Sequence, residues 1–210
     1  MGTRLAEKFD YTGIEADASA AAVAASRIAS RGAVLIQGDA AAVAPRGPFD
    51  VICAFEVLEH IEDDAGALAD WRSRLRPGGQ IILSVPAHQG RFGPADVLVG
   101  HYRRYPPEGL ERLLIRQGFE SVDVVMYGFP LGYALEAVRN RLAERSGASA
   151  KQSRRRPASQ TARSGRWLQP SGVTGLLTWL TTLPFRYLQR PFSRTRLGTG
   201  LVATARRPVE

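Results

Sequence analysis

Short apolar runs alternate with helix-forming segments along this chain, and this alternation limits its fold more than any other feature. AVLIQ at 33–37, FDVICAF at 49–55 and QIILSV at 80–85 are each bounded by glycine, proline or charged residues. Continuous apolar runs of this length are typical of strands buried in a parallel sheet. The segments between them predict one helix over 18–30 and another that begins at Asp63 or Asp64 and ends at the RPGG stop at 76–79.

Further elements continue the pattern to the end of the chain. We expect strands at 11–14, 119–127 and 199–205, a helix from Pro107 to Gly118, and two more helices at 129–145 and 171–190. This order predicts an α/β fold, with a doubly wound, mostly parallel Rossmann-like sheet and a helical insertion before the last strand. The expected domain comprises residues 1–128 and 198–207, and residues 129–197 form the helical and basic insertion.

The composition limits the cellular compartment and the binding partners that we expect for this protein. The chain has 210 residues, 44% of them hydrophobic, a net charge of +8 and a single cysteine, Cys53. One cysteine supports no disulfide framework, and no apolar run is long enough to span a membrane, so we expect a cytoplasmic protein. The basic tract 151–166 is interpreted as a solvated loop or as a contact for phosphates. The segment 171–194 combines apolar and arginine residues, so it is either a lid on the core or a peripheral membrane contact.

In a sheet of this kind, ligands bind outside the carboxyl ends of the strands. Glu15 ends the first predicted strand, Asp39 follows the second, and Phe55 and Glu56 end the third. A carboxylate at Glu15 can accept hydrogen bonds from both hydroxyls of a ribose, and Asp39 can accept from the amine of a base. Phe55 would supply an apolar wall.

Four segments then resemble a known family. GIEAD, GDA, FDVICAFEVLEHIED and LRPGGQIILSVPAH, in this order and spacing, resemble the class I S-adenosylmethionine-dependent methyltransferases, and the branch most similar is that of ubiquinone-type O-methyltransferases. The resemblance implies S-adenosylmethionine as cofactor and a small-molecule methyl acceptor, with a lipid-like acceptor as one form of it. It assigns the ribose to Glu15, the adenine side to Asp39 and Ala40, and the methionine side to Phe55. Glu56 and His60 would lie near the mouth of the active site.

The resemblance also raises a question about the N-terminus. In the family, a first strand and a glycine-rich loop precede the strand that ends at the ribose-binding acid. Here Gly2 matches the last glycine of that loop, and residues 3–9 match the helix behind it. The first strand and most of the loop are therefore expected to be missing, and three explanations stay open. Met1 is an internal methionine of a longer protein, the chain is a fragment, or it is a binding protein without activity.

The candidate catalytic residues are His60, Glu56, His88 and His101, and the imidazole of any of the three histidines could take the proton of the acceptor. Glu56, Glu59, His60 and Asp63 are expected on one face of a helix, which is equally typical of a solvated acidic surface. The loop GHYRRY at 100–105 either holds itself together by ion pairs or positions an anionic acceptor. No cysteine–histidine spacing predicts a metal site. The alternative functions are a non-catalytic binding or scaffold protein and, with less support, a nicotinamide-dependent oxidoreductase, and no specific nucleic-acid partner is expected.

Overall fold

The structure, a computed structural model, describes residues 2–28, 32–38, 47–145, 185 and 187–209. The chain divides into two compact units, one within residues 1–46 and the other built mainly from residues 47–210. The boundary before Gly47 lies inside the segment expected to form one domain. The domain limits drawn from the sequence stay a prediction. Asp39, Ala40, the basic tract 151–166 and most of the expected helix at 171–190 lie outside the described residues.

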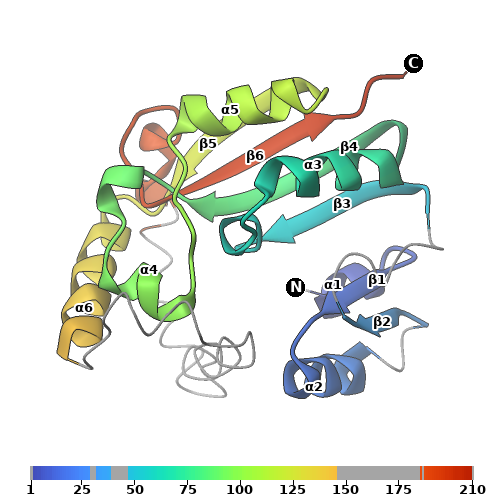
Figure 1. The fold of residues 1–210 in the computed structure, drawn as a ribbon, viewed down its shortest axis with the longest axis horizontal. Coiled ribbons are helices and arrows are strands. Elements are labelled where there is room, and N and C mark those ends of the chain that lie inside the picture. Colours follow the sequence, from blue (N-terminus) through green and yellow to red (C-terminus); the bar gives the residue numbers. More distant parts are fainter. Residues whose placement is uncertain (1, 29–31, 39–46, 146–184, 186, 210) are drawn as a thin grey trace. The chain divides into compact units, whose positions relative to one another are not determined.

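The first unit contains two helices and a two-stranded parallel sheet (Figure 1). Its elements are α1 (Gly2–Ala6), β1 (Thr12–Glu15), α2 (Ala18–Ile28) and β2 (Val34–Gln37). Gly13 pairs with Leu35 and Glu15 with Gln37. The helix α2 begins after Asp17, whose Oδ1 accepts hydrogen bonds from the backbone N–H of Ala20 and the hydroxyl of Ser19. The expected strand–helix–strand order is confirmed here.

The second unit contains a four-stranded sheet with the order β3–β4–β6–β5. Its strands are β3 (Phe49–Phe55), β4 (Leu75–Pro86), β5 (Glu120–Tyr127) and β6 (Gly200–Arg206). β3 runs parallel to β4, whereas β6 is antiparallel to both β4 and β5. The carboxyl ends of β3, β4 and β5 therefore lie at the same edge of the sheet. Strand β4 begins five residues before the expected QIILSV run, because Leu75 already pairs with Phe49.

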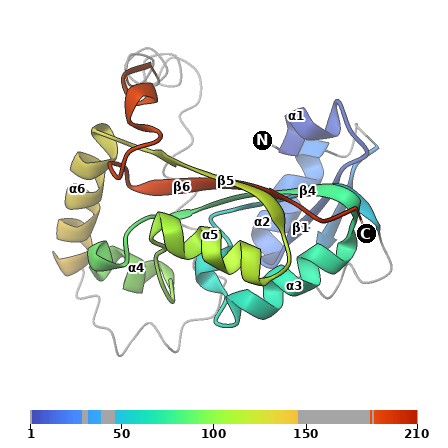
Figure 2. The ribbon, with the colours of Figure 1, turned by 90° about the horizontal axis from the view of Figure 1, so that it is seen from above.

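Two helices, α3 (Asp64–Arg74) and α5 (Pro107–Arg116), lie on the same face of this sheet (Figure 2). Leu68 and Trp71 of α3 and Leu110 and Leu114 of α5 are buried, and so is the centre of the sheet at Leu83. These are the apolar positions at helical spacing in the sequence. Removing such side chains from water is the main stabilising contribution to the fold.

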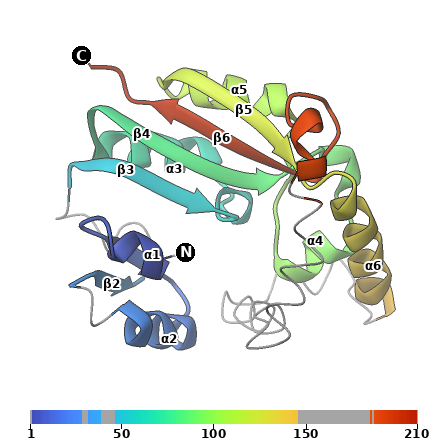
Figure 3. The same cartoon turned by 180° about the vertical axis from the view of Figure 1, so that it is seen from behind.

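A smaller helical layer lies beyond the strand ends. It consists of α4 (Pro94–Val99) and α6 (Leu131–Arg145), which contact each other (Figures 1 and 3). The short turns η3 (Leu58–His60), η4 (Gln89–Arg91) and η6 (Arg190–Phe192) complete the unit. No helix among the described residues is long and apolar enough to cross a membrane.

Two expectations about this unit are wrong. Glu56, Glu59, His60 and Asp63 do not share a helix face, because only residues 58–60 form a helical turn and Asp63 is the cap of α3. Glu56 instead has a φ of 54° and ends β3. Nor is β3 buried on both sides, because Val51, Cys53 and Phe55, which alternate along it, are exposed.

Candidate functional site at the strand ends

In the first unit, Glu15 is the last residue of β1 and is half-buried. One of its carboxylate oxygens accepts a hydrogen bond from the backbone N–H of Asp17, with 3.0 Å between nitrogen and oxygen. This bond fixes the turn between β1 and α2, and it directs the carboxylate to the end of the strand. A second ligand for the adenine side was expected at Asp39 and Ala40, which lie outside the described residues. The candidate Gly2 begins α1.

In the second unit, Glu56 directly follows β3, and its side chain connects this strand to β4 and β5. Its Oε1 accepts hydrogen bonds from the hydroxyls of Ser84 on β4, at 2.9 Å, and of Tyr127 on β5, at 3.0 Å. Burial, followed by the charge of Glu56 and this hydrogen bond, raises the pKa of Tyr127, so the phenol remains a donor. Phe55, the expected apolar wall, precedes Glu56 and is 38% exposed. No motif or spacing in the sequence pointed to Tyr127, which is 71 residues away from Glu56.

The turn after Glu56 brings Glu59, His60 and His101 together. The rings of His60 and His101 meet edge to face, with 4.7 Å between their centroids. Nε2 of His101 lies 3.8 Å from Oε1 of Glu59. Glu59 is fully buried, and neither of its carboxylate oxygens has a hydrogen-bond partner in the described structure. Burial, together with the charges of Glu56 and Asp96, raises the pKa of Glu59 to about 8.

The surroundings of His60 favour the neutral form of its imidazole. Burial lowers the pKa of its imidazole, and the neighbouring His101 lowers it further. A neutral imidazole has a nitrogen lone pair that can accept a proton or bind a metal ion. Two of the four expected catalytic residues, His60 and His101, are thus in contact, and Glu56 is close enough to affect the pKa of His60.

His88 has a different setting. It follows β4 with a φ of 62°, in the left-handed region that is rare for residues other than glycine. Its backbone N–H donates to the carbonyl of Tyr105, and its Nε2 is buried without a hydrogen-bond partner in the described part of the chain. Such strain at a strand end is common at binding sites. His88 is not part of the group formed by Glu59, His60 and His101.

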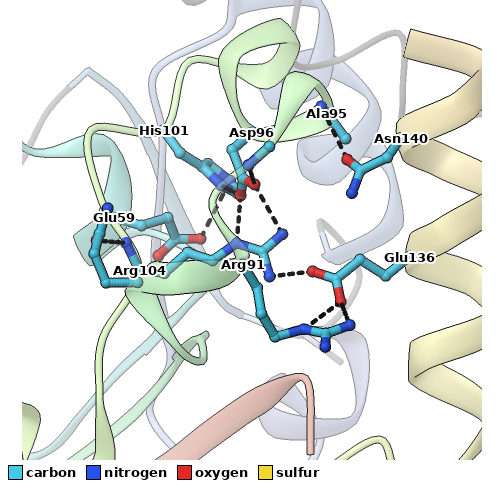
Figure 4. A network of polar contacts seen from close by, with 10 residues as sticks. Glu59, Arg91, Ala95, Asp96, His101, Arg104, Glu136 and Asn140 are labelled. Atoms are coloured by element: carbon cyan, nitrogen blue, oxygen red, sulfur yellow. Dashed lines mark hydrogen bonds and ion pairs between the residues drawn. The ribbon is translucent and has the colours of Figure 1, made fainter. Parts of the chain in front are cut away.

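The arginines of the GHYRRY loop are held by ion pairs within the protein. Arg103 pairs with Asp64 at 2.8 Å, while Arg104 is buried and pairs with Asp96 at 2.8 Å and with Glu136 of α6. Arg91 also pairs with Glu136 (Figure 4). Because the guanidinium of Arg104 is buried and bound on both sides, the ion-paired interpretation of this loop fits better than an anion-binding one.

Asp96 links this ion-pair network to the histidines (Figure 4). Its Oδ1 lies 2.8 Å from both Nδ1 of His101 and Nε of Arg104, and its Oδ2 accepts from the N–H of Gly93. Burial alone would raise the pKa of Asp96, but the hydrogen bonds from His101, Arg104 and Gly93 outweigh it and hold the pKa at about 2. Asp96 therefore stays ionised and holds Nδ1 of His101, so Nε2 is the ring nitrogen that faces Glu59.

Residues 3–124 match the family model described as a methyltransferase domain. A search of curated proteins finds no match to the chain.

Solved structures with a similar fold are distant in sequence. Phosphoethanolamine N-methyltransferase 2 of Haemonchus contortus, in complex with S-adenosyl-L-methionine, is 16% identical with a TM-score of 0.57. That match covers 98% of this chain but only 45% of the nematode enzyme. The [4+2]-cyclase SpnF is 19% identical with a TM-score of 0.53, and the match covers 100% of this chain and 73% of the cyclase.

A possible histamine N-methyltransferase of Thermotoga maritima is 15% identical with a TM-score of 0.50, over 98% of this chain and 78% of that one. These likenesses show the fold, and the cyclase among them shows that the fold does not fix the reaction. The family match spans more than half of the chain and includes Glu15, Glu56 and His60. This chain therefore belongs to the methyltransferase-domain family and has the α/β Rossmann-like fold of class I methyltransferases.

Proposed function

We propose that this protein is an S-adenosylmethionine-dependent methyltransferase that acts on a small-molecule acceptor. The observation that carries the proposal is the family match over residues 3–124, a segment that contains the acids at the ends of β1 and β3. In this proposal Glu15 binds the ribose hydroxyls of the cofactor, Asp39 and Ala40 contact its adenine, and Phe55 lines its methionine side. Gly2, the first residue of α1, approaches the cofactor in this proposal.

The reaction is an in-line displacement at the methyl carbon. An oxygen, nitrogen or carbon atom of the acceptor forms a bond to the methyl group as the bond from that carbon to the sulfonium sulfur breaks, and S-adenosylhomocysteine leaves. The reactive methyl group belongs to the cofactor, and the protein orients the reactants and excludes water. The acceptor proton passes to a base, for which His60, His88 and His101 are the candidates.

We further propose that the methyl acceptor is lipid-like. Leu135, Val138 and Leu142 are each more than half exposed and lie three and four residues apart on α6, which places them on one face. Arg139 and Arg145 on the same helix can contact anionic headgroups. Tyr187 and Leu188, in the segment expected to contact membranes, are also more than half exposed. These features support a peripheral contact with a lipid surface.

Calorimetric titration of S-adenosylmethionine into the 210-residue chain tests the proposal. We expect saturable binding with a micromolar dissociation constant, and product inhibition by S-adenosylhomocysteine at the same site. Absence of binding to the folded chain would contradict the proposal for this chain, and absence of binding to a chain extended upstream of Met1 would favour the non-catalytic alternative. The reduced nicotinamide cofactor, whose fluorescence changes on binding, serves as the comparison for the oxidoreductase alternative.

A further inference from the structure

The carboxylate of Glu59 has an unusual position for a charged group. It is fully buried, and neither oxygen accepts a hydrogen bond in the described structure. Burying a carboxylate without partners is costly, so proteins nearly always pair such a group with a donor, a cation or a metal ion. Two imidazoles lie close to it, since Nε2 of His101 is 3.8 Å from Oε1 of Glu59 and a ring nitrogen of His60 is within 4.8 Å of a carboxylate oxygen.

Glu59, His60 and His101 each have a possible metal-ligand atom close to those of the other two. One ligand atom each from Glu59, His60 and His101 lies within 4.8 Å of the other two. A metal bound at about 2.1 Å by nitrogen and oxygen holds its ligand atoms roughly 3.4 Å apart in a tetrahedral site. Nε2 of His101 and Oε1 of Glu59 are already 3.8 Å apart, and side-chain movements of about 1.5 Å or less would bring all three ligand atoms to the tetrahedral spacing.

Both imidazoles are oriented as they are in metal centres. Asp96 holds Nδ1 of His101 at 2.8 Å, which leaves Nε2 to point at Glu59. The backbone of Gly100 lies close enough to the imidazole of His60 to raise its pKa, against the larger effect of burial. Metal-binding histidines almost always use their second ring nitrogen in this way, bound to a carboxylate or a backbone carbonyl. Asp96 itself is fixed by Arg104, so the orientation of His101 is rigid.

From these observations we propose that Glu59, His60 and His101 form a binding site for a divalent first-row metal ion, with Asp96 as the residue that positions His101. Two imidazoles and one carboxylate suit Zn²⁺ or Mn²⁺ better than the all-oxygen sites of Ca²⁺. A bound ion would use the lone pairs of His60 and His101. His88 would then be the histidine left to act as a base in the proposed methyl transfer.

Metal binding to the full chain tests this directly. Purified protein is stripped with a chelator, and Mn²⁺ binding is followed by the loss of the free-ion electron paramagnetic resonance signal. Zn²⁺ is measured by competition with a chromogenic chelator. We expect one ion per chain, at least a tenfold weaker affinity in Glu59→Gln and in His101→Gln, and an affinity 10- to 100-fold weaker in Asp96→Asn. His88→Gln is the matched control, since it removes the third histidine and should leave the affinity unchanged.

Folding of each variant is checked by circular dichroism. Glu59→Gln keeps the shape of the side chain, and His60→Gln is a second variant at an independent ligand. Binding of less than one ion in five chains, or equal affinity in wild type, Glu59→Gln and His60→Gln, would overturn the proposal. The experiment needs no methyl donor or acceptor. A failed titration with S-adenosylmethionine would therefore contradict the proposed function and leave the metal result standing.

Discussion

Asp96 and His101 are joined by a hydrogen bond of 2.8 Å between Oδ1 and Nδ1, in a buried position where Asp96 also pairs with Arg104. The pair connects the α4 segment to the histidines at the end of β3. Through Arg104 and Glu136 it is also connected to α6 (Figure 4). A single carboxylate thus links the candidate site to the helical layer.

Asp96→Asn should therefore destabilise the protein strongly. The substitution leaves the guanidinium of Arg104 buried with only one carboxylate partner, and breaking a buried ion pair costs about 3–5 kcal/mol. The free energy of unfolding in urea measures the loss. Asp70→Asn is the matched control, because Asp70 is 41% exposed and pairs with Arg74 one helical turn away, where the expected loss is below about 1 kcal/mol. Equal losses in the two variants would contradict the role given to Asp96.

The lowered pKa of Asp96 predicts that the fold loses stability in acid. The folded-state pKa of Asp96 is about 2, below its ordinary value of 3.8. A carboxyl group whose pKa is lowered in the folded state stabilises the fold at pH values above its ordinary pKa. This contribution is lost as the pH falls from about 4 towards 2. Circular dichroism of the wild type should show the stability falling in this range. Asp96→Asn should show a shallower fall there, and an unchanged slope would show that other carboxylates are responsible.

The hydrogen bonds at Glu56 lead to a test by double-mutant cycle. Tyr127→Phe removes one of the two hydroxyl donors to Oε1 of Glu56, and we expect a loss of about 1 kcal/mol in the free energy of unfolding. Combined with Glu56→Gln, the two losses should not add, because the residues share one interaction. Tyr102→Phe is the control, since that ring is 53% exposed, and it should be neutral. Additive losses would mean that the hydrogen bond between Tyr127 and Glu56 contributes nothing to the free energy of unfolding.

Glu15 gives a prediction for the cofactor. If its carboxylate accepts from the ribose hydroxyls, Glu15→Gln should weaken binding of S-adenosylmethionine 10- to 100-fold, since a charge-assisted hydrogen bond contributes about 1.5–3 kcal/mol. Isothermal titration measures the change. Glu120→Gln, on an exposed residue at the start of β5, removes the same charge and should have no effect. An unchanged affinity in Glu15→Gln would remove Glu15 from the cofactor site.

The elements of this fold were predictable because their signals are local. The run at 49–55 matches β3 residue for residue, and the Asp63 cap and the Pro107 start of two helices follow from the side-chain and ring chemistry of those residues. The family motifs also predicted which residues follow the ends of the strands. The sequence could not show that residues 56–63 leave the helical path, because Glu56 adopts a positive φ that its side chain does not encode.

The partners within the site were harder to predict, because they come from distant segments. Glu59 carries the sequence signal of a surface acid, yet it is buried beside His101, which comes from the loop after α4. Glu136 lies on α6 and pairs with Arg91 and Arg104. These contacts depend on where the chain returns to the strand ends, and no spacing within one segment predicts that.

The exposed face of α6 gives the last prediction. Sedimentation with vesicles that contain anionic lipid should carry down the wild-type protein, because Leu135, Val138 and Leu142 can enter the headgroup region while the arginines of α6 stay outside. Replacing the three apolar residues by serine should reduce the bound fraction severalfold, and raising the salt should reduce it further. Ile115→Ser is the control, because Ile115 is 54% exposed on α5 and lies outside this face. If the triple variant binds as well as the wild type, α6 does not contact the lipid, and a water-soluble acceptor becomes the better form of the proposed function.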